Sequence, residues 1–164
     1  MISQALFVLA FAGAIGCGLV AGIFFAFSSF VMAALGRIPA EQGVTAMQSI
    51  NVVVINPSFF LAFFGTGLLC LALVAGSYFW WDGVSGKLIL AAALIYIVGC
   101  IGVTMVCNVP LNNALAAVQP GTPEAASLWA HYLDRWTMWN TVRTVAPTAS
   151  MIMLIVALIA APAA

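Results

Sequence analysis

The chain has 164 residues, of which 65% are hydrophobic and only 5% are charged, with four basic and four acidic side chains. Soluble domains carry about 25% charged residues, so a chain with a mean hydropathy of +1.20 is not an ordinary soluble domain. A formal net charge of zero also gives no basic surface for nucleic acid, and we expect no nucleic-acid partner. At about 20 residues per crossing, this length has room for roughly four membrane-spanning helices.

The first predicted span covers residues 5–35. This apolar run is much longer than the core of a secretory signal peptide, and no basic residue precedes it, so we interpret it as a retained helix. Gly18 and Gly22 are four residues apart and predict a close helix contact. Gly36 and Pro39 then end the helix.

The second predicted span covers residues 57–81. A semi-polar stretch at 40–55 precedes it and predicts a short helix near the membrane interface. Asn56 followed by Pro57 is a favourable helix start, with Asn as the cap and Pro in the first helical position. At the far end of this span we expect an aromatic belt formed by Tyr78, Trp80 and Trp81.

The third and fourth predicted spans cover residues 87–108 and 136–159. The tight turn at Asp82 leads into the third span, and a long polar connection at 109–135 precedes the fourth. The sequence therefore predicts an all-α fold. It is an integral membrane four-helix bundle in a single domain, 1–164, with short interfacial helices in its two long connections.

An even number of spans places both chain ends on one side of the membrane. Arg37, Arg135 and Arg143 then lie toward the long connections, whereas Lys87 lies toward the other side. Because basic residues concentrate in cytoplasmic loops, we expect the long connections in the cytoplasm, in a plasma membrane.

Metal and nucleotide motifs are absent from the sequence. The four cysteines at 17, 70, 100 and 107 fall in apolar runs, where we interpret them as small hydrophobic residues. The chain has one histidine and no nucleotide loop or paired carboxylates. We therefore predict no zinc or haem site, although a copper ion held by Met105 and Cys107 stays open.

The most informative polar residues fall on one face of the last helix. At 100° per residue, Trp129, Tyr132, Trp136, Asn140 and Arg143 share this face, and His131, Asp134 and Arg135 point the opposite way. Polar groups within hydrocarbon are costly and usually functional. Together with asparagines at the same membrane level, they predict a pocket for a flat ligand, lined by Asn56, Asn108, Asn112, Trp129, Tyr132, Trp136 and Trp139.

Each of these residues also has a structural interpretation. Trp129 and Trp136 fit interfacial anchors, and the asparagines fit helix caps or interhelical bonds. Arg143 could reach toward lipid headgroups, and His131 could be a solvated interfacial residue. The phenylalanine-rich stretches at 24–30 and 59–64 fit lipid-facing or core packing. These alternatives stay open at the level of sequence.

Three motifs carry a resemblance to a known family. Asn56-Pro57, Asn108-Val-Pro-Leu-Asn112 and Trp136-x-x-Trp139-Asn140-x-x-Arg143 resemble the motifs of the anthrone oxygenase family, small four-pass membrane proteins that occur in bacteria. The resemblance covers nearly the whole chain. It implies a bacterial inner membrane and the oxidation of an anthrone to a quinone by dioxygen, with no metal or flavin cofactor.

The resemblance also implies roles for particular residues. Arg143 would stabilise the developing oxyanion, while Asn140 and Asn108 would hold substrate oxygens. Trp136 and Trp139 would flank the ring system. His131 is the titratable candidate for a general base, although the helical projection turns it away from the aromatic face.

The expected partners are a hydrophobic aromatic small molecule or quinone and membrane lipids, and self-association into a homo-oligomer stays open. The alternative function is non-enzymatic: a protein that binds a quinone or another lipophile, or an accessory subunit of a membrane assembly. Arg143 together with Asn140 separates the two functions. An enzyme loses turnover without them, whereas an accessory protein loses ligand or partner retention.

Overall fold

The computed structural model describes residues 4–79 and 83–160, and this part of the chain is helical apart from short links. Four of its helices are long and apolar enough to cross a membrane, and they span Gln4–Leu35, Pro57–Ser77, Val84–Ala117 and Pro123–Ala160. The predicted all-α bundle of four spans is therefore confirmed. The predicted belt residues Trp80 and Trp81, the side chain of Tyr78 and the turn at Asp82 lie outside what is described.

Three of the long helices combine α-helical and π-helical segments. In the π-helical segments the backbone hydrogen bonds join residues five apart along the chain instead of four. The first helix consists of α1 (Gln4–Ala26), the π segment η1 (Phe27–Val31) and α2 (Met32–Leu35). The second consists of α4 (Pro57–Phe60), η2 (Leu61–Gly65) and α5 (Thr66–Phe79). The third consists of α6 (Val84–Tyr96), η3 (Ile97–Gly102), η4 (Thr104–Asn108) and α7 (Val109–Ala117), and the fourth is α8 (Pro123–Ala160).

The first long connection forms the predicted short helix, α3 (Ala40–Val53). Its buried face consists of Gly43, Val44 and Met47, which are three and four residues apart as a helix requires. A Cβ atom on Gly43 would lie only 2.7 Å from the ring of Trp129, so glycine allows α3 to pack directly against α8.

The start of the second long helix also follows the prediction. The side-chain oxygen of Asn56 accepts a hydrogen bond from the backbone N–H of Phe59 at 3.0 Å, and Pro57 occupies the first helical position. Asn56 therefore satisfies one of the backbone donors that a helix start leaves free.

The second long connection differs from the prediction. It contains no separate interfacial helix, because α7 and α8 extend the neighbouring spans and leave only residues 118–122 between them. Pro110 lies in the first turn of α7, directly after the π-helical segment η4, where its missing N–H is accommodated. Pro147 lies inside α8, which also continues past it.

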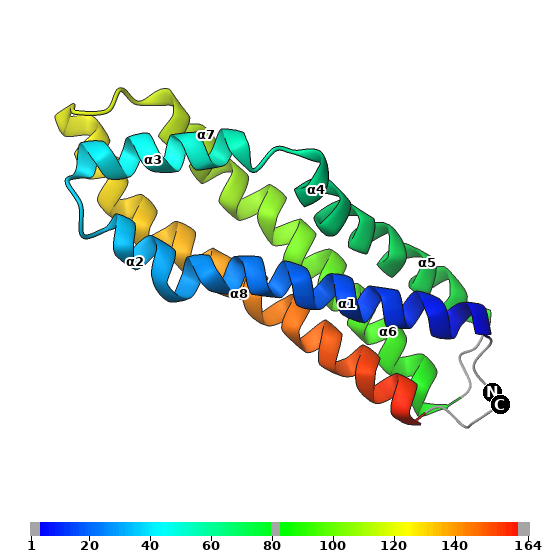
Figure 1. The fold of residues 1–164 in the computed structure, drawn as a ribbon. Coiled ribbons are helices and arrows are strands. Elements are labelled where there is room, and N and C mark those ends of the chain that lie inside the picture. The colour runs from blue at the N-terminus through cyan, green and yellow to red at the C-terminus, as the bar shows by residue number, and fades with distance from the viewer. Residues whose placement is uncertain (1–3, 80–82, 161–164) are drawn as a thin grey trace.

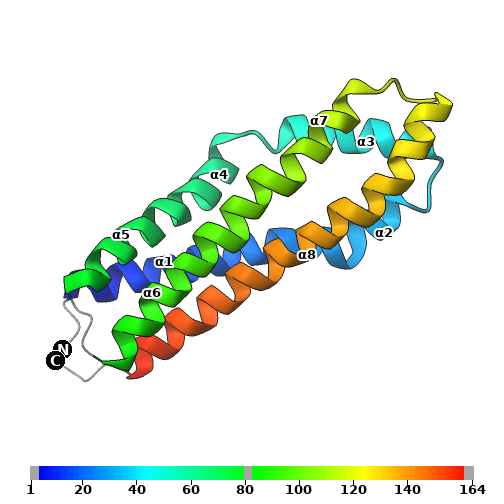
Figure 2. The ribbon, with the colours of Figure 1, turned by 180° about the vertical axis from the view of Figure 1, so that it is seen from behind.

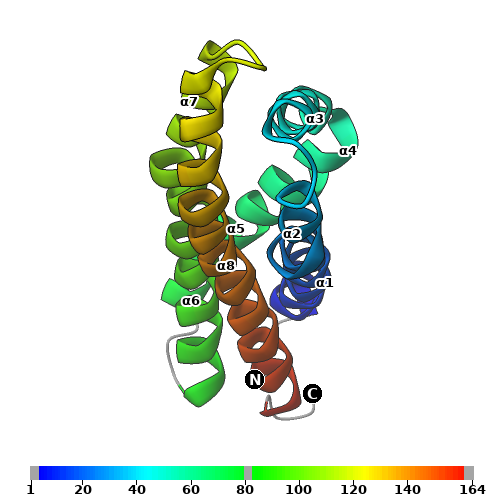
Figure 3. The same cartoon turned by 90° about the vertical axis from the view of Figure 1, so that its left-hand side faces the viewer.

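Helix α8 is the centre of the bundle. It contacts α1 along one side and α6 along the other, and Figure 3 shows it between these two helices. The beginning of α1 and the end of α8 lie at one end of the bundle, while α3 and the link from α7 to α8 lie at the other end (Figures 1 and 2). This arrangement agrees with four spans and two long connections on the same side.

Close packing between α1 and α5 depends on a different glycine from the predicted pair. A Cβ atom on Gly16 would overlap the side chain of Thr66, whereas a Cβ on Gly22 would meet nothing within 4 Å. Gly18 does approach Met151 of α8, but the prediction of a contact at Gly22 is wrong. The four-residue spacing of glycines identifies small residues on one face of α1. It does not show which of these residues faces a neighbouring helix.

Candidate functional site

Three of the π-helical segments contribute side chains to one cavity. Phe27 comes from η1, Phe63 and Phe64 come from η2, and Thr104 and Met105 come from η4. A π turn rotates the following side chains around the helix axis relative to a regular α-helix, and such turns occur frequently at functional sites. Three of the long helices therefore change from α-helical to π-helical geometry where they surround this cavity.

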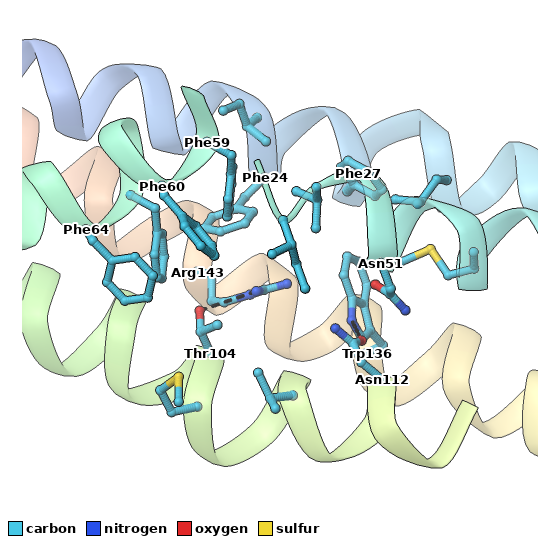
Figure 4. Close-up of a pocket in the computed structure, with 18 residues that line it drawn as sticks. Phe24, Phe27, Asn51, Phe59, Phe60, Phe64, Thr104, Asn112, Trp136 and Arg143 are labelled. Carbon is cyan, nitrogen blue, oxygen red and sulfur yellow. Dashed lines mark hydrogen bonds between the residues drawn. The ribbon is translucent and has the colours of Figure 1, made fainter. Parts of the chain in front are cut away.

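The cavity has a volume of ≈ 240 Å³ and lies between α1, α3, α4–η2, η4–α7 and α8. Aromatic rings dominate its lining, and Figure 4 shows Phe24, Phe27 and Phe59 along one side and Trp136 at one end. A cavity of roughly 150 Å³ lined by apolar side chains is enough to bind benzene. This cavity is larger, and its aromatic lining suits an aromatic ligand.

One flank of the cavity is open and apolar. The lining residues with the largest exposed fractions are Ile55 at 66%, Met105 at 54%, Phe64 at 43% and Phe60 at 42%. Phe60, Phe64 and Met105 belong to helices long enough to span a membrane. We call this exposed apolar flank the lateral opening.

The cation of Arg143 lies at the cavity wall, and only 5% of the residue is exposed. One guanidinium nitrogen donates to Oδ1 of Asn140 at 2.8 Å, and another donates to the hydroxyl of Thr104 at 3.3 Å. The guanidinium carbon lies 4.3 Å from the ring centroid of Phe24 and 5.1 Å from that of Trp136. Arg143 therefore points into the bundle, held by two neutral side chains and two aromatic faces.

The charge of Arg143 is incompletely compensated by the residues described. Its Nε–H is buried and has no hydrogen-bond partner, and neither of its two hydrogen-bond acceptors is charged. A buried cation is costly unless it is paired, and cation–π contacts offset only about 2 kcal/mol. An anionic oxygen in the cavity would supply the missing partner.

Two of the predicted site residues lie behind the cavity wall. Asn140 donates from Nδ2 to the carbonyl oxygen of Phe24 and to the hydroxyl of Ser28, both at 2.7 Å. Asn108 is fully buried and donates to the carbonyl oxygen of Trp136 at 3.1 Å, while its own Oδ1 has no partner. Neither residue lines the cavity. Asn140 positions the guanidinium of Arg143 and joins α8 to α1.

The end of the cavity at Trp136 contains a chain of polar contacts between three helices. The hydroxyl of Tyr132 and the indole N–H of Trp136 both donate to Oδ1 of Asn112, each at 2.8 Å. Asn51 of α3 donates to the Tyr132 oxygen at 3.4 Å. The rings of Trp129, Tyr132 and Trp136 are stacked along α8, with successive centroids 5.7 and 5.8 Å apart. The predicted aromatic face of α8 is thus buried as one unit.

Five further predicted site residues do not line the cavity, and one of them, Tyr132, contacts the lining through Asn112. His131 is exposed on the opposite face of α8, in agreement with the helical projection, and the structure does not bring it near Arg143. Asn56 caps α4, Trp129 packs against Gly43, and Trp139 is half-buried outside the lining. Of the cysteine and methionine pair considered for copper, Met105 lines the cavity and Cys107 does not.

The sequence interpretation missed Asn51 and the role of the phenylalanine-rich stretches. Asn51 follows Val44 by seven residues and Met47 by four, so it continues the buried face of α3. A polar residue on that apolar face was an available signal. Phe24 and Phe59 were interpreted as packing residues, since no periodic feature separates a ring that lines a cavity from a ring in the core.

Fold and site together define a class: an all-α bundle of four membrane-type helices with a buried cation at an aromatic cavity. The family model for anthrone oxygenase matches residues 59–153, which is more than half of the chain, and the protein belongs to this family. The matched region includes Asn112, Trp136 and Arg143 but neither α1 nor α3. No match was found among curated proteins or among solved structures.

Proposed function

We propose that the protein oxidises a polycyclic phenolic ketone of the anthrone type to the corresponding quinone with dioxygen, and that it does so without metal or flavin. The observation that carries this proposal is Arg143, a buried cation with neutral partners at the wall of an aromatic cavity. Membership of the anthrone oxygenase family supports the class of reaction.

The reaction converts a ring CH₂ group and O₂ into a ring C=O group and water. Loss of one proton from the CH₂ group gives an anion whose charge resides largely on the oxygen across the ring. This electron-rich anion transfers one electron to O₂, and the two radicals combine into a carbon-bound peroxide anion. The return of one proton, which balances the proton lost in the first step, converts this anion into the hydroperoxide. Loss of water from the hydroperoxide then forms the second carbonyl group of the quinone.

In this reaction Arg143 stabilises the anion by binding its oxygen, while Phe24 and Trp136 hold the guanidinium in a site of low polarity. The described lining contains no His, Asp or Glu side chain. The proposal therefore assigns no general base to the cavity. The acidity of the substrate, increased by the cation, supplies the anion.

The lateral opening supports a substrate dissolved in the bilayer. Its rim is apolar, and Phe60, Phe64 and Met105 of this rim lie on helices that are long and apolar enough to span a membrane. A neutral three-ring ketone partitions into hydrocarbon and can reach the cavity without crossing water. We place the reaction in the plasma membrane of a bacterium, with α3 and the 118–122 link on the cytoplasmic side because of the distribution of basic residues.

The test is oxygen uptake by the purified protein in detergent and metal-free buffer with a simple anthrone. Wild type is compared with Arg143→Met, which keeps a long side chain without charge, and with heat-denatured protein, because anthrones autoxidise. Removal of one donor to a developing oxyanion costs about 100-fold or more in turnover, so Arg143→Met should fall to the autoxidation background. Arg37→Met removes an exposed arginine as the matched control and should equal wild type. Equal uptake in wild type and Arg143→Met would refute the proposal.

A non-enzymatic role, the binding of a quinone or similar lipophile, is the second candidate. It is favoured by the absence of a titratable base from the described lining. A binding protein would show no uptake above background but would retain a quinone through purification. That retention should be lost in Arg143→Met.

A further inference from the structure

The polar chain at the end of the cavity has only one self-consistent arrangement of protons. The indole nitrogen of Trp136 can only donate, so the Asn112 atom 2.8 Å away from it must be the amide oxygen. The Tyr132 hydroxyl uses its single proton in its own bond to the same oxygen. The Tyr132 oxygen can then only accept from Asn51, which places the amide nitrogen of Asn51 toward Tyr132.

This arrangement leaves two amide atoms free. Nδ2 of Asn112 and Oδ1 of Asn51 make no hydrogen bond within the part of the chain that the structure describes. Both residues line the cavity, and Figure 4 shows them beside Trp136, beyond Arg143 as seen from Phe60 and Phe64. Both amides also contact the same tyrosine hydroxyl, so the two side chains lie near each other at this end of the cavity.

One free donor and one free acceptor together match a hydroxyl group, which accepts through its oxygen and donates its proton. Arg143 is the first group that recognises the ligand, through the ketone oxygen attached to the ring. We propose that Asn51 and Asn112 form a second recognition site, which selects a ligand with a hydroxyl group on its ring. Asn51 is then a specificity-determining residue. A ring without the hydroxyl would displace water from both amides and leave them unpaired.

Such a site discriminates mainly against the molecule that lacks the hydroxyl. Apolar pockets reject an added hydroxyl weakly, whereas a site that hydrogen-bonds a hydroxyl rejects its absence by several orders of magnitude in favourable cases. Because the Asn51 contact is long and both residues are partly exposed, we expect a preference of about 10-fold to 100-fold. The inference rests on the proposed function only for the identity of the ring system.

The test measures binding rather than turnover, with two redox-stable probes: 2-hydroxyanthraquinone and unsubstituted anthraquinone. Binding to purified protein in detergent is followed by quenching of tryptophan fluorescence, and the ratio of the two Kd values is compared between variants, so that partition into detergent cancels. Asn51→Leu is the principal variant, because it removes a single long hydrogen bond and should fold. Asn112→Leu is the second. Asn113→Leu changes the exposed neighbouring asparagine and is the matched control.

Wild type and Asn113→Leu should prefer the hydroxylated probe at least tenfold, and Asn51→Leu and Asn112→Leu should lose most of this preference. An unchanged ratio in a folded Asn51→Leu protein would overturn the inference. This result is distinct from failure of the proposed function. If the protein oxidises anthrone but binds both probes equally, the proposed function holds and the inference is wrong. If it prefers the hydroxylated probe but shows no oxygen uptake, the inference holds and the proposed function is wrong.

Discussion

The two halves of the bundle differ in how completely their buried polar groups are hydrogen-bonded. In the half that contains the beginning of α1 and the end of α8, which we call the packed half, buried polar side chains bond to nearby backbone. The Ser77 hydroxyl donates to the carbonyl oxygen of Val74, and the Ser150 hydroxyl lies 2.8 Å from the carbonyl oxygen of Ala92 in α6. Among the described residues of this half, no buried side-chain nitrogen or oxygen lacks a partner, which is the usual state of buried polar groups.

In the half that contains α3 and the cavity, which we call the cavity half, polar side chains also bond to one another, and some described atoms have no partner. Asn108 Oδ1 and Arg143 Nε are buried and unpaired, and one amide atom of each of the lining residues Asn51 and Asn112 makes no hydrogen bond. The described polar groups of the packed half are therefore satisfied within the protein. The cavity half leaves some polar atoms unpaired, and those of Asn51 and Asn112 belong to residues that line the cavity.

The largest expected effect lies in the packed half. Gly16→Leu would force a side chain into Thr66 and should destabilise the bundle by about 3 kcal/mol or prevent its assembly. Thermal unfolding in detergent, followed by circular dichroism, measures the change. Gly22→Leu is the matched control and should alter stability by no more than about 0.5 kcal/mol, because nothing lies within 4 Å. Equal losses in the two variants would show that α1 packs in a different register.

A smaller effect is expected at the lateral opening of the cavity half. Met105→Trp should narrow the opening and lower kcat/KM for a three-ring substrate by about tenfold, without a comparable change in thermal stability. Met138→Trp, on an exposed residue outside the lining, controls for added bulk. If Met105→Trp has the kinetics of wild type, ligands do not pass this flank.

The cap at the start of α4 tests the boundary of the cavity half. Asn56→Ala removes the bond to the Phe59 backbone and should cost about 1 kcal/mol of stability. Substrate binding should change little, because Asn56 does not line the cavity. If the free energy of substrate binding falls by more than the free energy of unfolding, Asn56 contributes to the site, as its motif predicted.

The smallest effect is expected for the only histidine. His131→Ala changes an exposed residue on the face of α8 turned away from Arg143, and turnover should stay within twofold of wild type. Oxygen uptake measured as for Arg143→Met checks this. A loss of tenfold or more would establish His131 as the base that the cavity lining lacks.

The face of α8 was predictable because helix periodicity is a local property. Spacings of three and four residues place Trp129, Tyr132, Trp136, Asn140 and Arg143 on one side whatever surrounds the helix, and all five are buried. The cap at Asn56 was predictable for the same reason. The fourth span is predicted to begin at Trp136, whereas α8 begins at Pro123, after the Thr122 hydroxyl that accepts from the backbone N–H of Ala125, and it contacts α3 and α7.

Composition alone determined that this chain forms four membrane-type helices, and periodicity alone placed a cation beside aromatic rings. Only the tertiary structure decided which glycine allows close packing, where the π-helical segments lie and which asparagines face the cavity. These features depend on contacts between helices far apart in the sequence. Asn51 donates a hydrogen bond to Tyr132, which is 81 residues away in the sequence, and no local sequence pattern predicts this contact.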